Sequence, residues 1–200
     1  MRSWFSLAAL VASVVLTACA ASLDPQVKSR IKTVVVDVKL SDLPGVSTPG
    51  SGTAAILSGN LGASNSDVRS TYQAVVQRHV NVAAVIEATA RSELQQRGFR
   101  VLERGQPSDA RLKIEGAYAL GLVSLPIDPR RRAMTTLYVT LVDAEGRVLW
   151  GNQGFGLTTP AYKERIRFAP YEQWFEKEAF AGEQHRLSAE MVTIELFKNF

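Results

Sequence analysis

A single cysteine is present among the 200 residues of the chain, and its position constrains how the rest can fold. It is Cys19, at the end of the tetrapeptide Leu16-Thr17-Ala18-Cys19, after an apolar run that starts at Trp4. Because there is no second cysteine, no intramolecular disulfide can form in any redox compartment. The folded part of the chain must therefore be stabilised by core packing alone.

The first 18 residues have the pattern of a secretory signal. Arg2 precedes the apolar run, which is shorter than the roughly 20 apolar residues of a membrane-spanning helix. Small residues, Ala18 and Ala20, flank the thiol that would accept a diacylglycerol group. We therefore expect a lipoprotein signal over residues 1–18 and acyl chains such as palmitate on Cys19. An ordinary secretory signal cleaved near Ala18, or a buried cysteine in a cytosolic chain, is the alternative.

The remaining 182 residues fit one domain, preceded by a tether over residues 19–32 that reaches about 40 Å when extended. Without residues 1–18 the chain keeps 22 Lys and Arg against 19 Asp and Glu, a formal charge of +3. This charge is too small to indicate a nucleic-acid partner, which requires a clustered basic face. The expected partner is instead a membrane, reached through the lipid.

Alternating apolar and polar residues predict strands. Val34, Val36, Val38 and Leu40 share one face of Thr33–Leu40, and similar alternation runs over residues 112–120 and 135–142. Asp143–Gly146 predicts a hairpin turn into residues 147–150. A short strand is expected over Phe99–Glu103.

Apolar residues at helical spacing predict two helices. Residues 81–97 have Asn81 as N-cap and Gly98 at the C′ position, and residues 187–197 form the second helix. Residues 68–80 either extend the first helix or form a strand. Residues 41–66 are rich in glycine and proline and predict no regular element.

Strands with one apolar face imply a sheet covered on one side. The sequence therefore predicts an α+β fold: a two-layer sandwich of a mostly antiparallel sheet with two helices packed on one face. This single domain is expected to span residues 33–200.

Three segments also carry a resemblance to a known group of proteins: Leu94–Val101, Ser108–Gly116 and Val139–Trp150. In this order they resemble small envelope lipoproteins of Gram-negative bacteria. The shared domain is similar to the N-terminal domain of the Tol-system propeller protein, the curli secretion-channel lipoprotein and lipoprotein activators of penicillin-binding proteins. The resemblance implies a binding or assembly module, although a shared fold does not fix function.

Two departures distinguish the chain from parts of this group. It lacks the long tether of the synthase activators. Neither residues 41–66 nor residues 151–173 show the alternation of membrane-inserting hairpins.

The sequence offers little for catalysis. His79 and His185 are far apart, and no zinc-ligand spacing or Gly-x-Ser-x-Gly motif occurs. We expect His79, on an apolar helical stripe, to have a packing or capping role, and His185 to be solvated. Gly50–Ala55 matches Gly-x-Gly-x-x-Ala but lacks the flanking strand and helix of a dinucleotide site. We therefore expect no enzyme activity, no cofactor and no metal.

The sequence offers more candidates for binding residues than for catalytic residues. Arg130, Arg131 and Arg132 are expected in an exposed loop, either gripping anionic lipid or polymer groups or simply solvated. Trp174 belongs to an aromatic-rich segment that either covers the core or contacts a partner. A further interaction candidate is the uncovered sheet face, where we expect the side chains of Asp37, Lys39, Arg111, Lys113, Glu115 and Tyr138.

The expected function is a non-enzymatic binding or assembly module of the cell envelope. Ala20 follows Cys19, where other lipoproteins carry an Asp as inner-membrane retention signal, so the periplasmic face of the outer membrane is expected. The expected partner is an envelope protein or a second copy of the chain. A subunit of an oligomeric ring or secretion pore in the outer membrane is the alternative.

Overall fold

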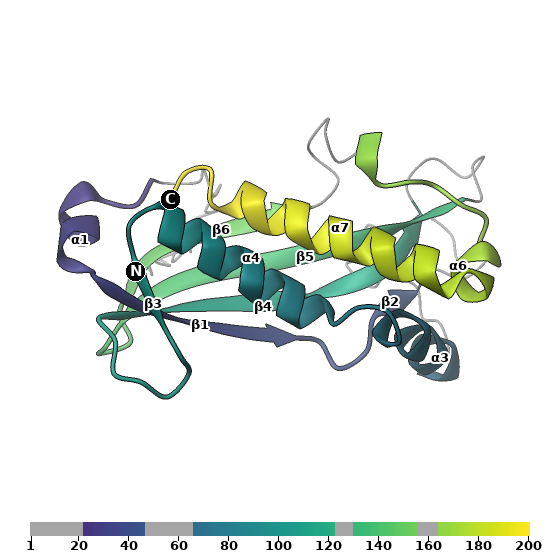
Figure 1. Cartoon of the computed structure of the whole chain (residues 1–200), viewed down its shortest axis with the longest axis horizontal. Helices are drawn as coiled ribbons and strands as arrows, with labels where there is room; N and C mark the ends of the chain where they lie inside the picture. The colour runs from purple at the N-terminus through teal and green to yellow at the C-terminus, as the bar shows by residue number, and fades with distance from the viewer. Residues whose placement is uncertain (1–21, 47–65, 123–129, 156–163) are drawn as a thin grey trace, which may run out of the picture.

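The computed structural model describes residues 22–46, 66–122, 130–155 and 164–200. Cys19 and Gly50–Ala55 lie outside these ranges. The described residues form a sheet with helices packed against it, as Figure 1 shows, which confirms the α+β class. The elements in chain order are α1 (Pro25–Arg30), β1 (Thr33–Leu40), β2 (Gly45–Val46), α3 (Ser66–Gln77), α4 (Val82–Gln96), β3 (Arg100–Leu102), β4 (Ala110–Leu122), β5 (Arg131–Asp143), β6 (Val148–Phe155), α6 (Gln173–Glu176) and α7 (Glu178–Leu196).

The sheet is mixed, in the order β3-β1-β4-β5-β6, with β2 beside β4. Its longest pairing is antiparallel and joins the two 13-residue strands β4 and β5, and β6 continues the meander. β1 runs parallel to both of its neighbours, β3 and β4. A parallel pair needs a crossover connection, and α3 and α4 provide it between β1 and β3.

Both long helices, α4 and α7, lie on the same face of the sheet, as predicted. Alternation places Val34, Val36, Leu112 and Ile114 under these helices, where each is at most 1 % exposed. Trp150 and Phe197 complete the core at the C-terminal end of α7.

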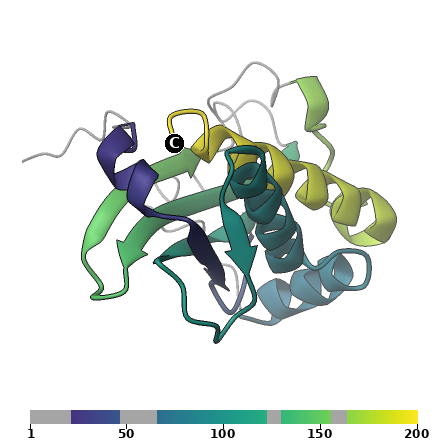
Figure 2. The ribbon, with the colours of Figure 1, turned by 60° about the vertical axis from the view of Figure 1, so that its left-hand side comes forward.

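The segment that could have been one long helix is two helices. α3 ends at Gln77 and α4 begins at Val82, where the side chain of Asn81 accepts a hydrogen bond from the Ala84 amide at 3.1 Å. α4 ends as predicted, because Gly98 has a φ of 87° and lets Phe99 donate its amide to Leu94. Figure 2 shows α3 lying beyond the N-terminal end of α4.

Residues assigned to the tether from the sequence pack on the domain instead. Leu23 is 4 % exposed and Ile31 is 5 % exposed, and both belong to the main core. Between them, Asp24 caps the short helix α1 by accepting a hydrogen bond from Gln26. The domain therefore begins near Leu23, about ten residues earlier than the alternation at Thr33 indicates.

Candidate functional site

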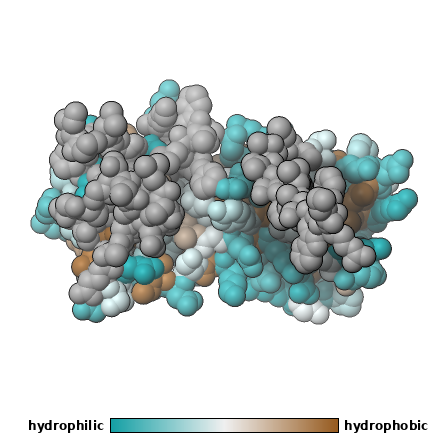
Figure 3. All heavy atoms as spheres, turned by 180° about the vertical axis from the view of Figure 1, so that it is seen from behind, coloured by the Kyte–Doolittle hydropathy of each residue, from teal (hydrophilic) through white to brown (hydrophobic). Residues whose placement is uncertain are grey.

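No described helix covers the second face of the sheet. It carries the exposed side chains that alternation predicted there, among them Arg111, Lys113, Glu115 and Tyr138. Figure 3 shows the molecule from this side, and the visible described atoms are largely hydrophilic, with smaller hydrophobic areas. The exposed side chains of this face are therefore carried by the paired strands of the sheet.

Strand register places four side chains of this face in one row across the sheet. Lys39 of β1 pairs with Glu115 of β4, Glu115 with Tyr138 of β5, and Tyr138 with Gln153 of β6. Tyr138 is 49 % exposed although it lies in the middle of its strand. We call Lys39, Glu115, Tyr138 and Gln153 the Tyr138 row.

A shallow hollow of about 420 Å³ lies along the Tyr138 row. Gly116 and Ala117 of β4 are among the residues that line it. A methyl group on Gly116 would meet the carbonyl oxygen of Thr136, so this position requires glycine. The row thus combines a cation, a carboxylate, an amide and an aromatic ring around a depression.

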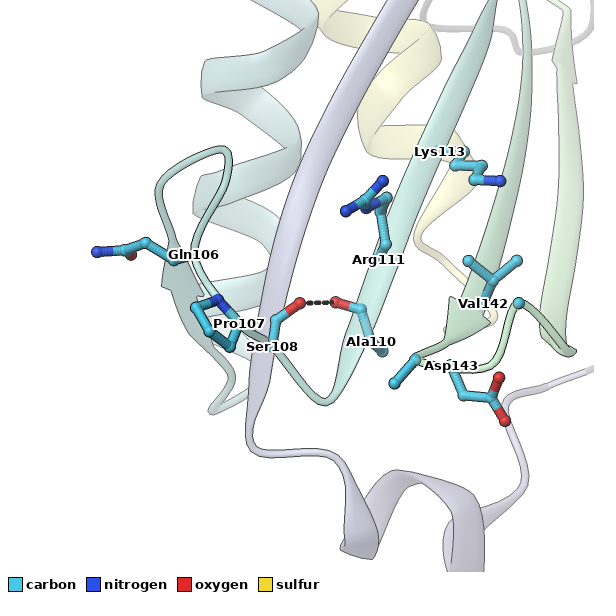
Figure 4. Close-up of a pocket in the computed structure, with 10 residues that line it drawn as sticks. Gln106, Pro107, Ser108, Ala110, Arg111, Lys113, Val142 and Asp143 are labelled. Atoms are coloured by element: carbon cyan, nitrogen blue, oxygen red, sulfur yellow. Dashed lines mark hydrogen bonds between the residues drawn. The ribbon is translucent and has the colours of Figure 1, made fainter.

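A second hollow, of about 380 Å³, lies on the same face at the end of the sheet nearest α1. Figure 4 shows Arg111 and Lys113 projecting from β4 beside it, with the β3–β4 loop on one side and the β5–β6 turn on the other. The loop is fixed by Ser108, whose hydroxyl donates to the Ala110 carbonyl at 2.9 Å. This end of the face is basic.

The predicted arginine cluster lies elsewhere, at the opposite end of β5. The expectation of an exposed loop is wrong for Arg131 and Arg132, which are 2 % and 1 % exposed and belong to β5. Arg130 is exposed, and the guanidinium groups of Arg130 and Arg132 lie 5.5 and 5.4 Å from the ring centroid of Phe168. The backbone of Arg131 pairs with Ala169 in both directions, at 2.7 and 2.9 Å.

Burial of these arginines follows from their place in the strand. The sequence predicted this strand over residues 135–142, with the arginines in a loop before it, whereas β5 begins at Arg131. Desolvation by this burial lowers the pKa of Arg131 from its ordinary value. Arg131 and Arg132 are buried and make cation–π contacts with Tyr171 and Phe168, whereas Arg130 is exposed.

Trp174 is also not a surface residue. It is 0 % exposed, and its indole Nε1 donates to the Ala169 carbonyl at 3.2 Å. Its ring packs 5.0 Å from Phe180. Of the two roles expected for Trp174, the structure thus shows the first, because the aromatic segment before α7 covers the core.

The two histidines have exchanged their expected environments. His185 is 0 % exposed, and its Nε2 lies 2.8 Å from the hydroxyl of Tyr72. Burial lowers the pKa of His185 to about 3, so it is neutral at physiological pH. His79 is exposed beyond the end of α3, with Nε2 3.5 Å from the carboxylate of Glu178. A stripe of buried residues at helical spacing could have predicted that His185 is buried; its members are Ala181, His185, Ser188 and Val192. Two of these four residues are polar, so the stripe did not stand out in the sequence.

Two kinds of feature are absent from the described residues. No group of three or more His, Cys, Asp or Glu side chains is placed to hold a metal ion. No helix in these ranges has the length and apolarity needed to cross a bilayer. The Tyr138 row instead provides charged, amide and aromatic side chains on the paired strands of a sheet.

No family model and no curated protein matches the chain. Among solved structures it is similar to a Xanthomonas campestris protein of family DUF330, with 13 % identity and a TM-score of 0.42 over 83 % of this chain and 81 % of that one. It is also similar to the PelC dodecamer from Paraburkholderia phytofirmans, with 15 % identity and a TM-score of 0.30 over 79 % and 86 %. A proposed lipoprotein from Caulobacter crescentus has 10 % identity and a TM-score of 0.29 over 64 % and 93 %. At these levels of similarity no conclusion about function follows.

Proposed function

We propose that this chain is a lipid-anchored protein of the bacterial cell envelope whose domain binds a protein partner without catalysing a reaction. Support for the anchor comes from the sequence around Cys19, and the residue after it, Ala20, favours the periplasmic face of the outer membrane. Acyl chains contribute about 0.8 kcal/mol per buried methylene, so several chains on one residue hold a domain at a membrane.

The observation that carries the binding role is the uncovered face of the sheet. Both long helices pack on the other face, which leaves the Tyr138 row accessible. Tyrosine is enriched among the residues that dominate interface energetics, because it supplies a large apolar surface and a hydroxyl at low entropic cost. Glu115 lies beside Tyr138 and Lys39 lies next to Glu115 in the row, and their opposite charges suit a partner surface of complementary mixed charge.

Site-specific photocrosslinking in intact cells of the source organism tests this role. A photoreactive phenylalanine in place of Tyr138 is expected to give a discrete adduct with a second protein. The matched control is the same group at Gln95, an exposed position on the opposite, helical side of the molecule in α4. Adducts of equal yield at both positions, or none at Tyr138, would contradict the assigned face.

A ring subunit remains a second candidate function, and one feature favours it. β3 and β6 are the two ends of the strand order, and edge strands present backbone groups that pair readily with another chain. Sizing of the detergent-extracted protein separates the candidates. A single large species supports a ring, whereas a monomer excludes it and leaves the partner-binding role.

A further inference from the structure

The residue at which the folded domain begins limits how far the domain can lie from a lipid on Cys19. Leu23 is buried in the core, and four residue steps separate it from Cys19. Even a fully extended chain spans at most about 14 Å over that separation. If Cys19 is acylated, as proposed above, the end of the domain that carries Leu23 and α1 must lie at the bilayer surface.

The β5–β6 turn, the start of β4 and the β3–β4 loop all lie at this end. Figure 2 shows α1 beside the β5–β6 hairpin, and a hollow of about 390 Å³ between them is lined by Arg30 of α1 and Arg147 of the hairpin. It adjoins the basic hollow of Figure 4, because Ser108 and Asp143 line both. The membrane-proximal end is thus a continuous surface from α1 to the uncovered sheet face.

Four exposed cationic side chains of this surface are among those with no ion pair within the described ranges. They are Arg30 of α1 and three residues of the uncovered sheet face, Arg100, Arg111 and Lys113, all of them exposed. Register explains why the last three share a face: their partners in β1 are Thr33, Val35 and Asp37, at alternate positions. We call Arg30, Arg100, Arg111 and Lys113 the basic end.

The carboxylates near the basic end form hydrogen bonds or ion pairs with groups outside it. Asp109 accepts hydrogen bonds from the Lys32 amide, the Thr33 amide and the Thr33 hydroxyl, at 2.8, 2.8 and 2.9 Å, and these bonds lower its pKa. Asp143 is paired with Arg147, whose Nε lies 2.6 Å away. Desolvation raises the pKa of Asp143, but the hydrogen bonds from Arg147 outweigh it. Asp37 lies 3.8 Å from Arg104.

We propose that the basic end binds the phosphate groups of anionic phospholipids, so that the domain docks on its own membrane with α1 toward the bilayer. Guanidinium groups bind phosphate oxygens bidentately, and Lys113 adds a point charge beside Arg111. Each basic residue near an anionic surface contributes about fivefold to binding. The Tyr138 row lies further along the same face, away from the bilayer.

Vesicle cosedimentation of the mature chain carrying Cys19→Ser tests the docking without the anchor. The protein is expected to bind vesicles of phosphatidylcholine mixed with phosphatidylglycerol and to leave pure phosphatidylcholine vesicles unbound. The double variant Arg111→Gln/Lys113→Gln should bind the mixed vesicles more weakly by about fivefold per charge removed.

The matched control is Arg167→Gln/Lys177→Gln, which removes the same charge from exposed residues at the far end of the molecule. This control is expected to bind like the parent, and thermal unfolding shows whether each variant is folded. Equal binding to neutral vesicles, or equal losses in both double variants, would overturn the docking proposal. Since this assay uses no lipidated protein, its failure is distinct from a failure of the proposed anchor or of crosslinking at Tyr138.

Discussion

At the scale of single residues, the most unusual environment is that of His185 inside the core. Its ring lies between Tyr72, Tyr118 and Trp174, with centroid distances of 5.7, 5.1 and 6.3 Å. Its Nε2 is bonded to Tyr72, and its Nδ1 has no hydrogen-bond partner among the described residues. Such a site admits a neutral imidazole and penalises a charged one.

This environment predicts that acid destabilises the fold through His185. Burial lowers its pKa from 6.5 to about 3, so below pH 6.5 the unfolded chain binds a proton that the folded chain does not. The free energy of unfolding should then fall as the pH is lowered below 6.5, with a slope that approaches about 1.4 kcal/mol per pH unit near pH 5. Urea titrations at several pH values measure this slope.

One variant isolates the contribution of His185 to that slope. His185→Phe keeps an aromatic ring in the core and should have a flatter pH dependence than the parent chain. An unchanged slope in His185→Phe would refute the assignment. The sequence could not separate the two histidines, because both follow helical spacing and the choice depends on how α3 and α7 pack.

At the scale of elements, the pairing of β4 with β5 controls the shape of the candidate site. Gly116 lies where β4 approaches β5 too closely for a side chain, and it borders the hollow beside Tyr138. Gly151 of β6 differs, because a methyl group there would be 3.4 Å from the Val139 carbonyl, an ordinary contact.

The two glycines therefore make a matched pair of substitutions. Gly116→Ala is expected to lower the free energy of unfolding by about 1–3 kcal/mol, because the methyl group forces β4 away from β5. Gly151→Ala should change it by less than about 0.5 kcal/mol. Urea denaturation of both variants measures this difference, and equal effects would contradict the register between β4 and β5.

Elements defined by local patterns were predictable from the sequence. β1 has its predicted bounds, Thr33–Leu40, because alternation is unbroken there, and α4 has its predicted cap at Asn81. The parallel pairing of β1 with β4 was not predictable, because the residues of a strand do not indicate which other strand it pairs with. The membership of Arg131 and Arg132 in β5 was missed because their polar character masked the strand.

The candidate site was predicted only in part, for the same reason. Alternation identified the exposed side chains of the sheet face, including Tyr138. It could not show that Lys39, Glu115 and Tyr138 form one row, because that depends on the register of three strands. The role of Trp174 stayed open between core covering and partner contact, because composition alone does not tell which aromatic rings fill the core.

At the scale of the whole molecule, one prediction concerns anchoring. Cys19→Ser removes the only thiol that can be acylated, so the variant should move from the membrane fraction to the soluble periplasmic fraction. The substitution lies outside the described domain, and the variant should therefore unfold at the same temperature as the parent. Membrane fractionation at low and high salt measures it, since docking by the basic end alone should be released by salt.

The whole account depends on a lipid at one position, and intact-mass spectrometry of the protein purified from its native host tests this most directly. We predict a mature chain that begins at Cys19, lacks residues 1–18 and carries the added mass of a diacylglycerol group. A chain that retains residues 1–18, or one whose Cys19 has a free thiol, would contradict the account.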